Sequence, residues 1–506
     1  MAKKAAAKQS RFRVSGLDLR ALSAFRIIVG LNVIYNLIKY RFFAGGIYYT
    51  SDGITDPIAI KNVYGEIFSL LTIFQSDAFV LGFLAFTFLL AVLYVLGIKA
   101  RWVAPLLFFC FGNVIVANPW TVHAVEFLIE ASLFYSIFLP IDHYFAIMPT
   151  KEKKVSGNEL RTFPAFVLLI QIFFVYFTSG ITKSGEYWRE GLTVLSVMDD
   201  RMHAGMLADW FAANPGLCSF LTYSTVYVEV LIGLLLFSPL FNKRIRLALA
   251  LTIPALHFGL AFGMNVGPFH WITLAFAIVI LPDFVWDALL SRLGIKTKSK
   301  KSKKKSTKPV ITNPLWQIWA VRVFLGAFLI IVFIQNLKKW ERDSYFSSSI
   351  YNNPVLHGLA EVKLPNPPIF IGLWNQPWWT FSPNPHEQMG CFLMLGRKAD
   401  NTSVDLATGR TISVSPDPNT GEPVFSEKPQ NQLKRTHFVF SWYVRRQVNQ
   451  MPKPLLKRWL DVVTEEYNKN HPNDPVSETG LFMFYNQTDL VNGQITKDRQ
   501  FIQIQL

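Results

Sequence analysis

Lys183 is a residue that could do chemistry, because it ends an apolar run that a lipid bilayer could hold. The run and its continuation read FFVYFTSGITKSGEYWREG, from Phe173 to Gly191. Burial disfavours the charged form of lysine, and a neutral lysine amine is a usable general base. The other interpretation is that Lys183 lifts its ammonium from a helix end into water, and position alone favours this one.

A second apolar run carries three ionisable residues on one side. The segment HAVEFLIE contains His123, Glu126 and Glu130, and offsets of three and seven place them on one helix face. At a rise of about 1.5 Å per residue, Glu126 and Glu130 lie about 4.5 Å and about 10 Å below His123. This stripe would lead from the outer surface into the protein. Ionisable groups inside a membrane are expensive and indicate function, but Glu130 could instead pair with Arg26.

Other polar residues interrupt the apolar runs. We expect Arg26, Glu130 and Glu229 to form a structural network inside the membrane. His257 is followed by Asn265 near the outer end of its run, so both could meet His123 and Lys183 in one outward-facing pocket. A lone histidine in an apolar run is, however, more often a satisfied core residue.

Nine apolar segments of about the length that crosses a bilayer would position these residues. They are 19–40, 77–97, 102–117, 122–139, 163–181, 221–240, 247–264, 271–284 with the apolar residues that follow, and 315–337. The third and the eighth are the shortest. A content of 51% hydrophobic and 17% charged residues is too apolar for a soluble chain of 506 residues. The sequence therefore predicts a mainly α polytopic membrane bundle.

Lysine and arginine clusters predict the orientation of the bundle. They occur in MAKKAAAKQSRFR, GIKAR, KEKKVSGNELR, NKRIR and KTKSKKSKKKSTK, and nine spans place every cluster on one side. The positive-inside rule makes that side cytoplasmic, with the C-terminus outside. The net charge of +16 therefore reflects topology, and we exclude nucleic-acid binding. The basic start resembles an uncleaved anchor rather than a signal peptide, and the lysine-rich segment could touch anionic lipid.

The domain organisation follows from these patterns. We assign residues 1–18 to a basic cytoplasmic N-terminus, 19–290 to a transmembrane core, 291–313 to a Lys-rich cytoplasmic linker, 314–340 to the last transmembrane helix and 341–506 to an extracytoplasmic domain. The last region contains strand-like runs, THFVFSWYV and RQFIQIQL, and an amphipathic run, LLKRWLDVVTEEYNKN. These patterns predict a small α+β domain.

Cysteine usage predicts neither a disulfide framework nor a metal centre. Cys110, Cys218 and Cys391 have no metal-ligand spacing. A bridge between Cys218 and Cys391, which would share the outer compartment, is open but not demanded by the spacing.

Several motifs together resemble those of the HTTM (horizontally transferred transmembrane domain) family and of its relative, the vitamin K-dependent γ-glutamyl carboxylase family. SGITKSGEYWREG resembles the lysine motif of the carboxylases, with Gly180, Lys183, Trp188, Glu190 and Gly191 at the matching positions. LDLRALSAFRIIVGLNVIYNL, WTVHAVEF, LHFGLAFGMNVGPFHW and NQPWWTFSPNP are similar to the opening helix, two histidine-bearing helices and the segment that opens the C-terminal domain of bacterial-type members.

The resemblance implies an activity. Lys183 would deprotonate a reduced vitamin K or menaquinone-type naphthoquinone, O₂ would add, and the quinone would leave as its epoxide. The strong base generated on the way would remove a γ-proton from a peptide glutamate, and CO₂ would take its place. The catalytic candidates are Lys183, His123 and His257, and the substrate-binding candidates are Asn265, Trp188, Glu126 and Tyr227. No metal is implied.

Departures from the carboxylase pattern leave other functions open. Thr182 stands where the animal enzymes carry a second lysine, and the outer domain is much shorter than theirs, so quinol oxidation is better supported than carboxylation. A second hypothesis is a non-catalytic maturation or immunity partner of a secreted peptide. A third is a transporter, but we find no internal repeat with matched broken helices. The resemblance to bacterial members suggests the bacterial inner membrane.

Overall fold

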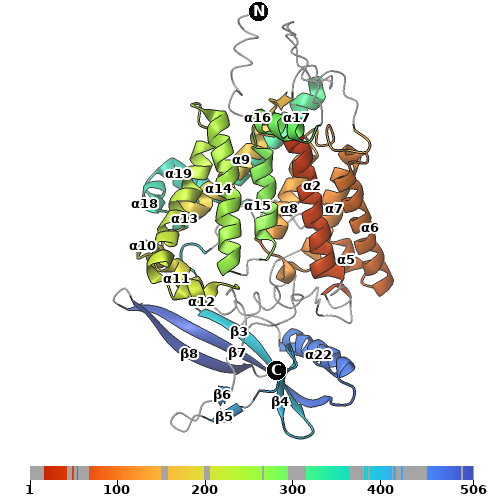
Figure 1. The fold of residues 1–506 in the computed structure, drawn as a ribbon, viewed down its shortest axis with the longest axis vertical. Helices are drawn as coiled ribbons and strands as arrows, with labels where there is room; N and C mark the ends of the chain where they lie inside the picture. The colour runs from red at the N-terminus through yellow and green to blue at the C-terminus, as the bar shows by residue number, and fades with distance from the viewer. Residues whose placement is uncertain are drawn as a thin grey trace, which may run out of the picture.

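The computed structural model shows a helical bundle with a small α+β domain at one end (Figure 1). It describes residues 16–42, 48–50, 54, 68–149, 158–198, 205–264, 267–294, 315–364, 378, 381–385, 388–412, 414–416, 423–425, 453–491 and 494–504. The predicted cytoplasmic N-terminal residues before 16, most of the Lys-rich linker, Asn265 and the predicted strand THFVFSWYV lie outside these ranges.

The long helices form the bundle. They are α2 (Leu19–Asn36, continued by η1, Leu37–Phe42), α6 (Asp77–Leu96), α7 (Ala100–Ala117), α8 (Ala124–Ser136), α9 (Phe163–Ile181), α13 (Pro215–Leu235), α14 (Asn242–Gly263), α15 (Phe269–Val279), α16 (Asp283–Arg292) and α17 (Leu315–Asp343). Short helices decorate it: α5 (Leu70–Ile73), η2 (Pro119–Thr121), α10 (Glu186–Arg189), α11 (Thr193–Met198), α12 (Ala208–Ala212), α18 (Ser347–Tyr351) and α19 (Pro354–Ala360).

Local sequence signals explain where these helices begin and end. The Ser76 hydroxyl caps the start of α6 by accepting a hydrogen bond from the Phe79 amide. The same helix ends at Gly97, whose φ of +69° is accessible to glycine without steric cost. Proline stands in the first turn of both α9 and α13, where its missing N–H costs nothing.

Seven of the described helices are long and apolar enough to cross a membrane, and eight if the bent pair α15–α16 counts as one span. The prediction of nine spans is therefore only partly confirmed. The fourth predicted segment, 122–139, forms the shorter helix α8, because Pro119 opens a separate turn and residues 122 and 123 are extended. The eighth breaks with a bend of 100° at Leu281 and Pro282, since proline does not continue a helix.

Contacts between chain segments define the two ends of the bundle. Strands β1 (Leu17–Asp18) and β2 (Glu159–Leu160) pair, which places the starts of α2 and α9 at one end. At the opposite end, the Arg41 guanidinium in η1 donates to Thr121, just before α8. The start of α8 and the end of α9 therefore lie at the same end of the bundle, which is the end next to the α+β domain (Figure 1).

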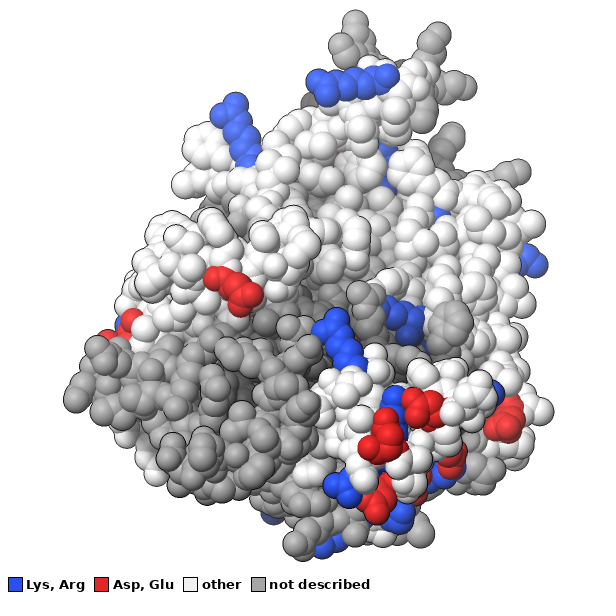
Figure 2. Space-filling view, turned by 60° about the horizontal axis from the view of Figure 1, so that its bottom comes forward, with Lys and Arg blue, Asp and Glu red and all other residues white. Residues whose placement is uncertain are grey.

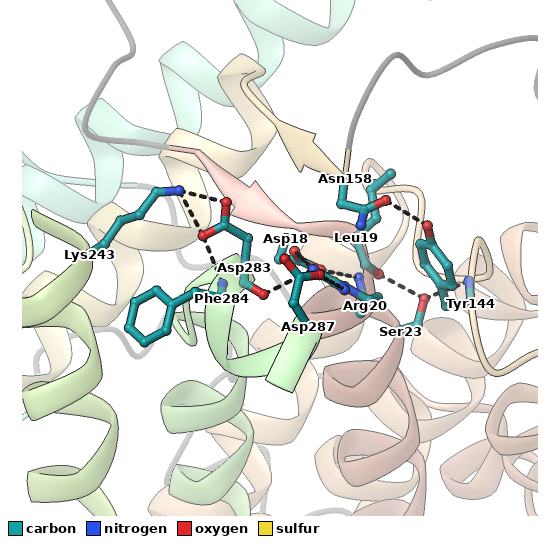
Figure 3. A network of polar contacts seen from close by, with 10 residues as sticks. All are labelled: Asp18, Leu19, Arg20, Ser23, Tyr144, Asn158, Lys243, Asp283, Phe284 and Asp287. Carbon is teal, nitrogen blue, oxygen red and sulfur yellow. Dashed lines mark hydrogen bonds and ion pairs between the residues drawn. The ribbon is translucent and has the colours of Figure 1, made fainter. Parts of the chain in front are cut away.

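An ionic network ties the first end of the bundle together (Figure 3). Arg20 is fully buried and binds Asp18 at 2.7 Å and Asp287 of α16 at 2.6 Å. Asp18 also caps α2, and Lys243 at the start of α14 pairs with Asp283 at 2.6 Å. The network joins α2, α14 and α16. In the orientation that the positive-inside rule predicts, this is the cytoplasmic end.

The C-terminal part is an antiparallel sheet covered by one helix, as the predicted α+β domain requires. The sheet has the order β4–β3–β7–β8, and a separate two-stranded sheet pairs β5 with β6. The strands are β3 (Gln388–Lys398), β4 (Ser403–Asp405), β5 (Val414–Pro416), β6 (Pro423–Phe425), β7 (Val476–Val491) and β8 (Gln494–Ile504). The predicted amphipathic helix is α22 (Lys453–Asn470), whose Trp459 is buried with its ring 5.5 Å from that of Phe392.

Charge separates the two parts of the protein. In Figure 2 the bundle surface is largely uncharged, whereas acidic and basic side chains gather over α22. Ion pairs such as Lys457–Asp461 and Arg458–Glu465 lie on that helix. An uncharged bundle with apolar helices fits an integral membrane protein, and the charged surface of the domain at its end is suited to contact with water.

Candidate functional site: a buried lysine–glutamate pair

Two glycines allow α9 and α13 to pack closely. A Cβ atom at Gly180 would lie 2.9 Å from the backbone nitrogen of Val230, and one at Gly233 would lie 3.2 Å from that of Phe177. Small residues let helix backbones approach each other in a membrane. This close packing brings Glu229 of α13 to the end of α9.

Lys183 is buried at that helix end and bound to Glu229. Only 2% of Lys183 is exposed. Its Nζ donates to Glu229 Oε2 at 2.5 Å, to Ser179 Oγ at 2.6 Å and to the Ser179 carbonyl at 3.0 Å. The ammonium does not snorkel to water but enters a compact polar site. Sequence reasoning placed Glu229 in a different network and gave Ser179 no role.

Trp188 closes one side of this site. The centre of its ring is 5.3 Å from Lys183 Nζ, which is within range of a cation–π interaction. Its indole N–H donates to the Phe381 carbonyl at 2.8 Å. Trp188, a substrate-binding candidate from the family resemblance, therefore lies beside Lys183.

Residues 182–187, here named the lysine loop, follow α9 directly. The C-terminal part of the chain holds this loop through residues 381–385, here named the FSPNP strap. The Pro383 carbonyl accepts from the Gly185 amide at 3.0 Å, and Asn384 Oδ1 accepts from the Tyr187 amide at 3.2 Å. The Ser382 hydroxyl donates to the Thr182 carbonyl. The strap belongs to the segment NQPWWTFSPNP, so the structure gives that motif a physical role beside Lys183.

Helix α17 and Tyr345, two residues after its end, support the loop from another side. Thr178 donates to Asn336 Oδ1 at 2.6 Å and accepts from Trp340 Nε1 at 3.0 Å. The Tyr345 hydroxyl donates to the Lys183 carbonyl at 2.7 Å. The backbone of Lys183 is therefore fixed by residues more than 150 positions away, as the 162-residue separation of Tyr345 shows.

His257 is linked to the lysine site through Tyr176. The Tyr176 hydroxyl lies 3.1 Å from His257 Nε2, and both side chains are buried. The Lys183 ammonium is close enough to act electrostatically on the His257 ring, and Glu229 acts on Tyr176 in the same way. His257, Tyr176, Glu229 and Lys183 thus form one polar group among apolar helices, here named the lysine cluster.

His123 and Glu126 belong to a second polar group at the same end of the bundle. The Glu126 carboxylate accepts from the His123 amide at 2.8 Å, which caps α8. It also accepts from Asn36 Nδ2 at 2.5 Å and lies 3.5 Å from a guanidinium nitrogen of Arg41. The three-residue spacing of His123 and Glu126 therefore serves a helix cap. Sequence reasoning missed Asn36 and Arg41, whose polar character in an apolar run was the available signal.

Arg26 does not pair with Glu130. Its guanidinium donates to three backbone carbonyls, those of Val95, Ile141 and Phe145. These carbonyls end α6 or lie in the loop after α8, and they give both terminal guanidinium nitrogens a partner without a carboxylate. The expected network of Arg26, Glu130 and Glu229 is wrong in this respect.

The substrate-binding candidates Tyr227 and Asn265 are placed in neither polar group, and Glu126 lies in the second group rather than in the lysine cluster. Tyr227 is 68% exposed on α13 and points away from the bundle interior, although it precedes Glu229 by only two residues. Asn265 lies outside the described residues. Cys218 is a buried free thiol, so the structure contains no bridge from it to Cys391.

Gly185→Ala is expected to loosen the FSPNP strap. A Cβ atom there would lie 2.0 Å from Asn384 Oδ1 and 2.6 Å from the Pro383 carbonyl oxygen. Overpacking of this kind costs about 1–3 kcal/mol, so the thermal unfolding midpoint in detergent should fall. Gly82→Ala is the control, because nothing lies within 4 Å of a Cβ at Gly82. Equal midpoints for both variants would show that the strap does not press on the loop.

Comparison with protein-family models matches residues 15–286 to the HTTM domain. The match covers more than half of the chain and includes both polar groups described above. The HTTM domain is a membrane domain found in the vitamin K-dependent carboxylase family. No curated protein and no solved structure matches the chain. The helical bundle and the domain match lead to one conclusion: the chain belongs to the HTTM family.

Proposed function

We propose that this protein is a membrane-embedded oxidoreductase that converts a reduced naphthoquinone to its epoxide with O₂. The observation that carries the proposal is the burial of Lys183 against Glu229, with Trp188 beside it. A stably buried lysine paired with a carboxylate is a candidate proton acceptor. The chain contains an HTTM domain, and this domain also occurs in the vitamin K-dependent carboxylase family, which supports this substrate class.

The chemical role of the pair is to accept a proton from a quinol hydroxyl. Lys183 Nζ and Glu229 Oε2 are 2.5 Å apart, so one proton can reside on either group. In one arrangement the proton resides on Lys183 and Glu229 is the base. In the other, Glu229 holds the proton and the neutral Lys183 amine is the base. In both cases, Lys183 and Glu229 are both protonated after the proton has been transferred from the quinol.

The overall reaction balances without a metal. One quinol and one O₂ give one quinone epoxide and one water, and the quinol supplies the two hydrogens. Carboxylation of a peptide glutamate, in which CO₂ replaces a γ-proton, is a second half-reaction that the domain relationship suggests. Quinol oxidation does not require that half.

The surrounding residues have supporting roles in this proposal. Tyr176 and His257, in contact at 3.1 Å, add a second hydrogen-bonded pair to the polar surroundings of Lys183 and Glu229. The lysine site lies at the bundle end opposite the ionic network of Arg20. With the predicted orientation, the site faces the periplasm or cell exterior, and in this proposal the quinol enters from the lipid.

The test is product formation by the purified, full-length protein in lipid nanodiscs. A dithiol-reduced naphthoquinone is supplied in air-saturated and in oxygen-free buffer, and the epoxide is separated by chromatography. We expect epoxide only with protein and oxygen together. Labelled bicarbonate and a glutamate-containing peptide in the same reaction test the carboxylation half. Absence of epoxide across several naphthoquinone side-chain lengths would contradict the proposed activity.

A further inference from the structure

A group of metal-ligating side chains lies at the end of α17, outside the lysine cluster. Glu341 belongs to the last turn of α17, His357 to α19, and Glu361 follows α19 directly. One nitrogen or oxygen atom of each residue lies within 4.8 Å of the others. The spacing of four residues between His357 and Glu361 puts both on one face of α19, toward Glu341.

The helices that carry this group are held in place by packing and capping. Leu337, Ile350 and Ala360 form a small buried cluster that joins α17, α18 and α19. Asn353 caps α19 by accepting from the Val355 and Leu356 amides, both at 3.1 Å. The three side chains therefore project from a fixed framework, which a metal site requires.

The charges of the group are unbalanced. The pair of carboxylates, Glu341 and Glu361, has no ion pair with lysine or arginine in the part of the chain that the structure describes. The neighbouring cations Lys339 and Arg342 pair with Asp343 instead. His357 Nδ1 lies 2.6 Å from Glu341 Oε1, but one imidazole carries at most one positive charge and so cannot balance two carboxylates.

The donor set fits a particular class of cation. One imidazole nitrogen and two carboxylate oxygens suit a divalent transition metal such as Zn²⁺, whereas Mg²⁺ and Ca²⁺ prefer oxygen donors only. Tetrahedral zinc needs donors roughly 3.3 Å apart, and the exposed Glu361 side chain can rotate to close the remaining distance. The Tyr351 ring, 4.9 Å from that of His357, limits the orientation of the imidazole.

We propose that Glu341, His357 and Glu361 bind a divalent transition-metal ion of the Zn²⁺ class. The remaining coordination positions face solvent and hold water, because Glu361 is exposed. Binding requires neutral His357 and replaces its hydrogen bond to Glu341. No metal was expected from the cysteine spacing or from the family resemblance, and the H-x₃-E spacing of HGLAE is the signal for this site in the sequence.

The bound metal would act on the structure around Lys183. It would tie the end of α17 to α19, and that end touches the lysine loop through two contacts. The Asp343 carbonyl accepts from Ser184 Oγ at 2.6 Å, and Tyr345 donates to the Lys183 carbonyl. We therefore assign the site a structural role in holding the loop, independent of the proposed quinol chemistry.

Zinc binding by tag-free, full-length protein in detergent tests the proposal. The protein is stripped with a chelator, dialysed and titrated with ZnCl₂, while bound zinc and the thermal unfolding midpoint are measured. We expect one equivalent per chain and a rising midpoint, because a ligand that binds only the folded state stabilises it. Cobalt should replace zinc and give visible absorption from a protein-bound ion.

Glu361→Gln separates a metal site from a simple ion pair. Glu361 does not take part in the Glu341–His357 pair, so its loss should leave the metal-free midpoint unchanged but weaken zinc at least about tenfold. Glu478→Gln, on the exposed sheet, is the matched control. Unsaturable or absent zinc binding by the wild type would overturn the proposal, as would equal affinities for wild type and Glu361→Gln. So would a zinc-induced rise in midpoint that His357→Ala leaves intact.

Discussion

Lys183→Arg is expected to abolish naphthoquinol oxidation as completely as Lys183→Ala, with a loss of about a hundredfold or more. Arginine keeps the positive charge but is effectively never deprotonated in a protein, so it cannot serve as the base. Its planar guanidinium also does not fit the single-point contacts that the lysine amine makes with Ser179 and Glu229. Epoxide formation is measured at equal amounts of folded protein.

The control for this prediction is Lys243→Arg. Lys243 pairs with Asp283 at the other end of the bundle, and both side chains are partly exposed, so turnover should be unchanged. A Lys183→Arg variant that is folded and as active as wild type would show that the residue contributes only charge. The base would then have to be found elsewhere.

Removing Glu229 alone is expected to destabilise the protein more than removing both members of the pair. Glu229→Leu leaves the Lys183 ammonium buried without a carboxylate, which costs about 3–5 kcal/mol when a buried pair is broken. Lys183→Met leaves Glu229 in the same state. The double variant places two apolar side chains in contact, and replacing a buried pair this way is often neutral or stabilising. All three variants should be inactive.

Unfolding free energies of the wild type, both single variants and the double variant give the coupling energy of the pair. The predicted pattern is low stability for each single variant and recovery for the double variant, with activity lost throughout. Additive losses would contradict a tight Lys183–Glu229 pair. Restored activity in the double variant would remove the pair from the mechanism.

The fold was predictable because apolar length and charge are local properties of the sequence. Runs such as 77–97 and 163–181 became α6 and α9 with almost the same bounds. The fourth and the eighth predicted spans failed for a local reason as well, because Pro119 and Pro282 interrupt their helices. The presence of Lys183 and Trp188 at one site also follows from their proximity in sequence.

The partners of Lys183 were not predictable, because helix packing decides them. Glu229 lies 46 residues from Lys183 and meets it only because Gly180 and Gly233 let α9 and α13 touch. Arg26 binds backbone carbonyls, and a sequence pattern of side chains does not indicate which carbonyls will be close to it. The contact of Ser382 with Thr182 spans 200 residues and brings part of the C-terminal region to the helical bundle.

Isotope transfer from oxygen gas to the quinone epoxide is the most direct test of the central claim. Nanodisc-embedded wild type and Lys183→Arg are given the same reduced naphthoquinone under isotopically heavy O₂, and the product is weighed by mass spectrometry. The account predicts heavy epoxide from the wild type and none above the empty-nanodisc level from Lys183→Arg. No heavy epoxide from the wild type, or equal amounts from both proteins, would contradict it.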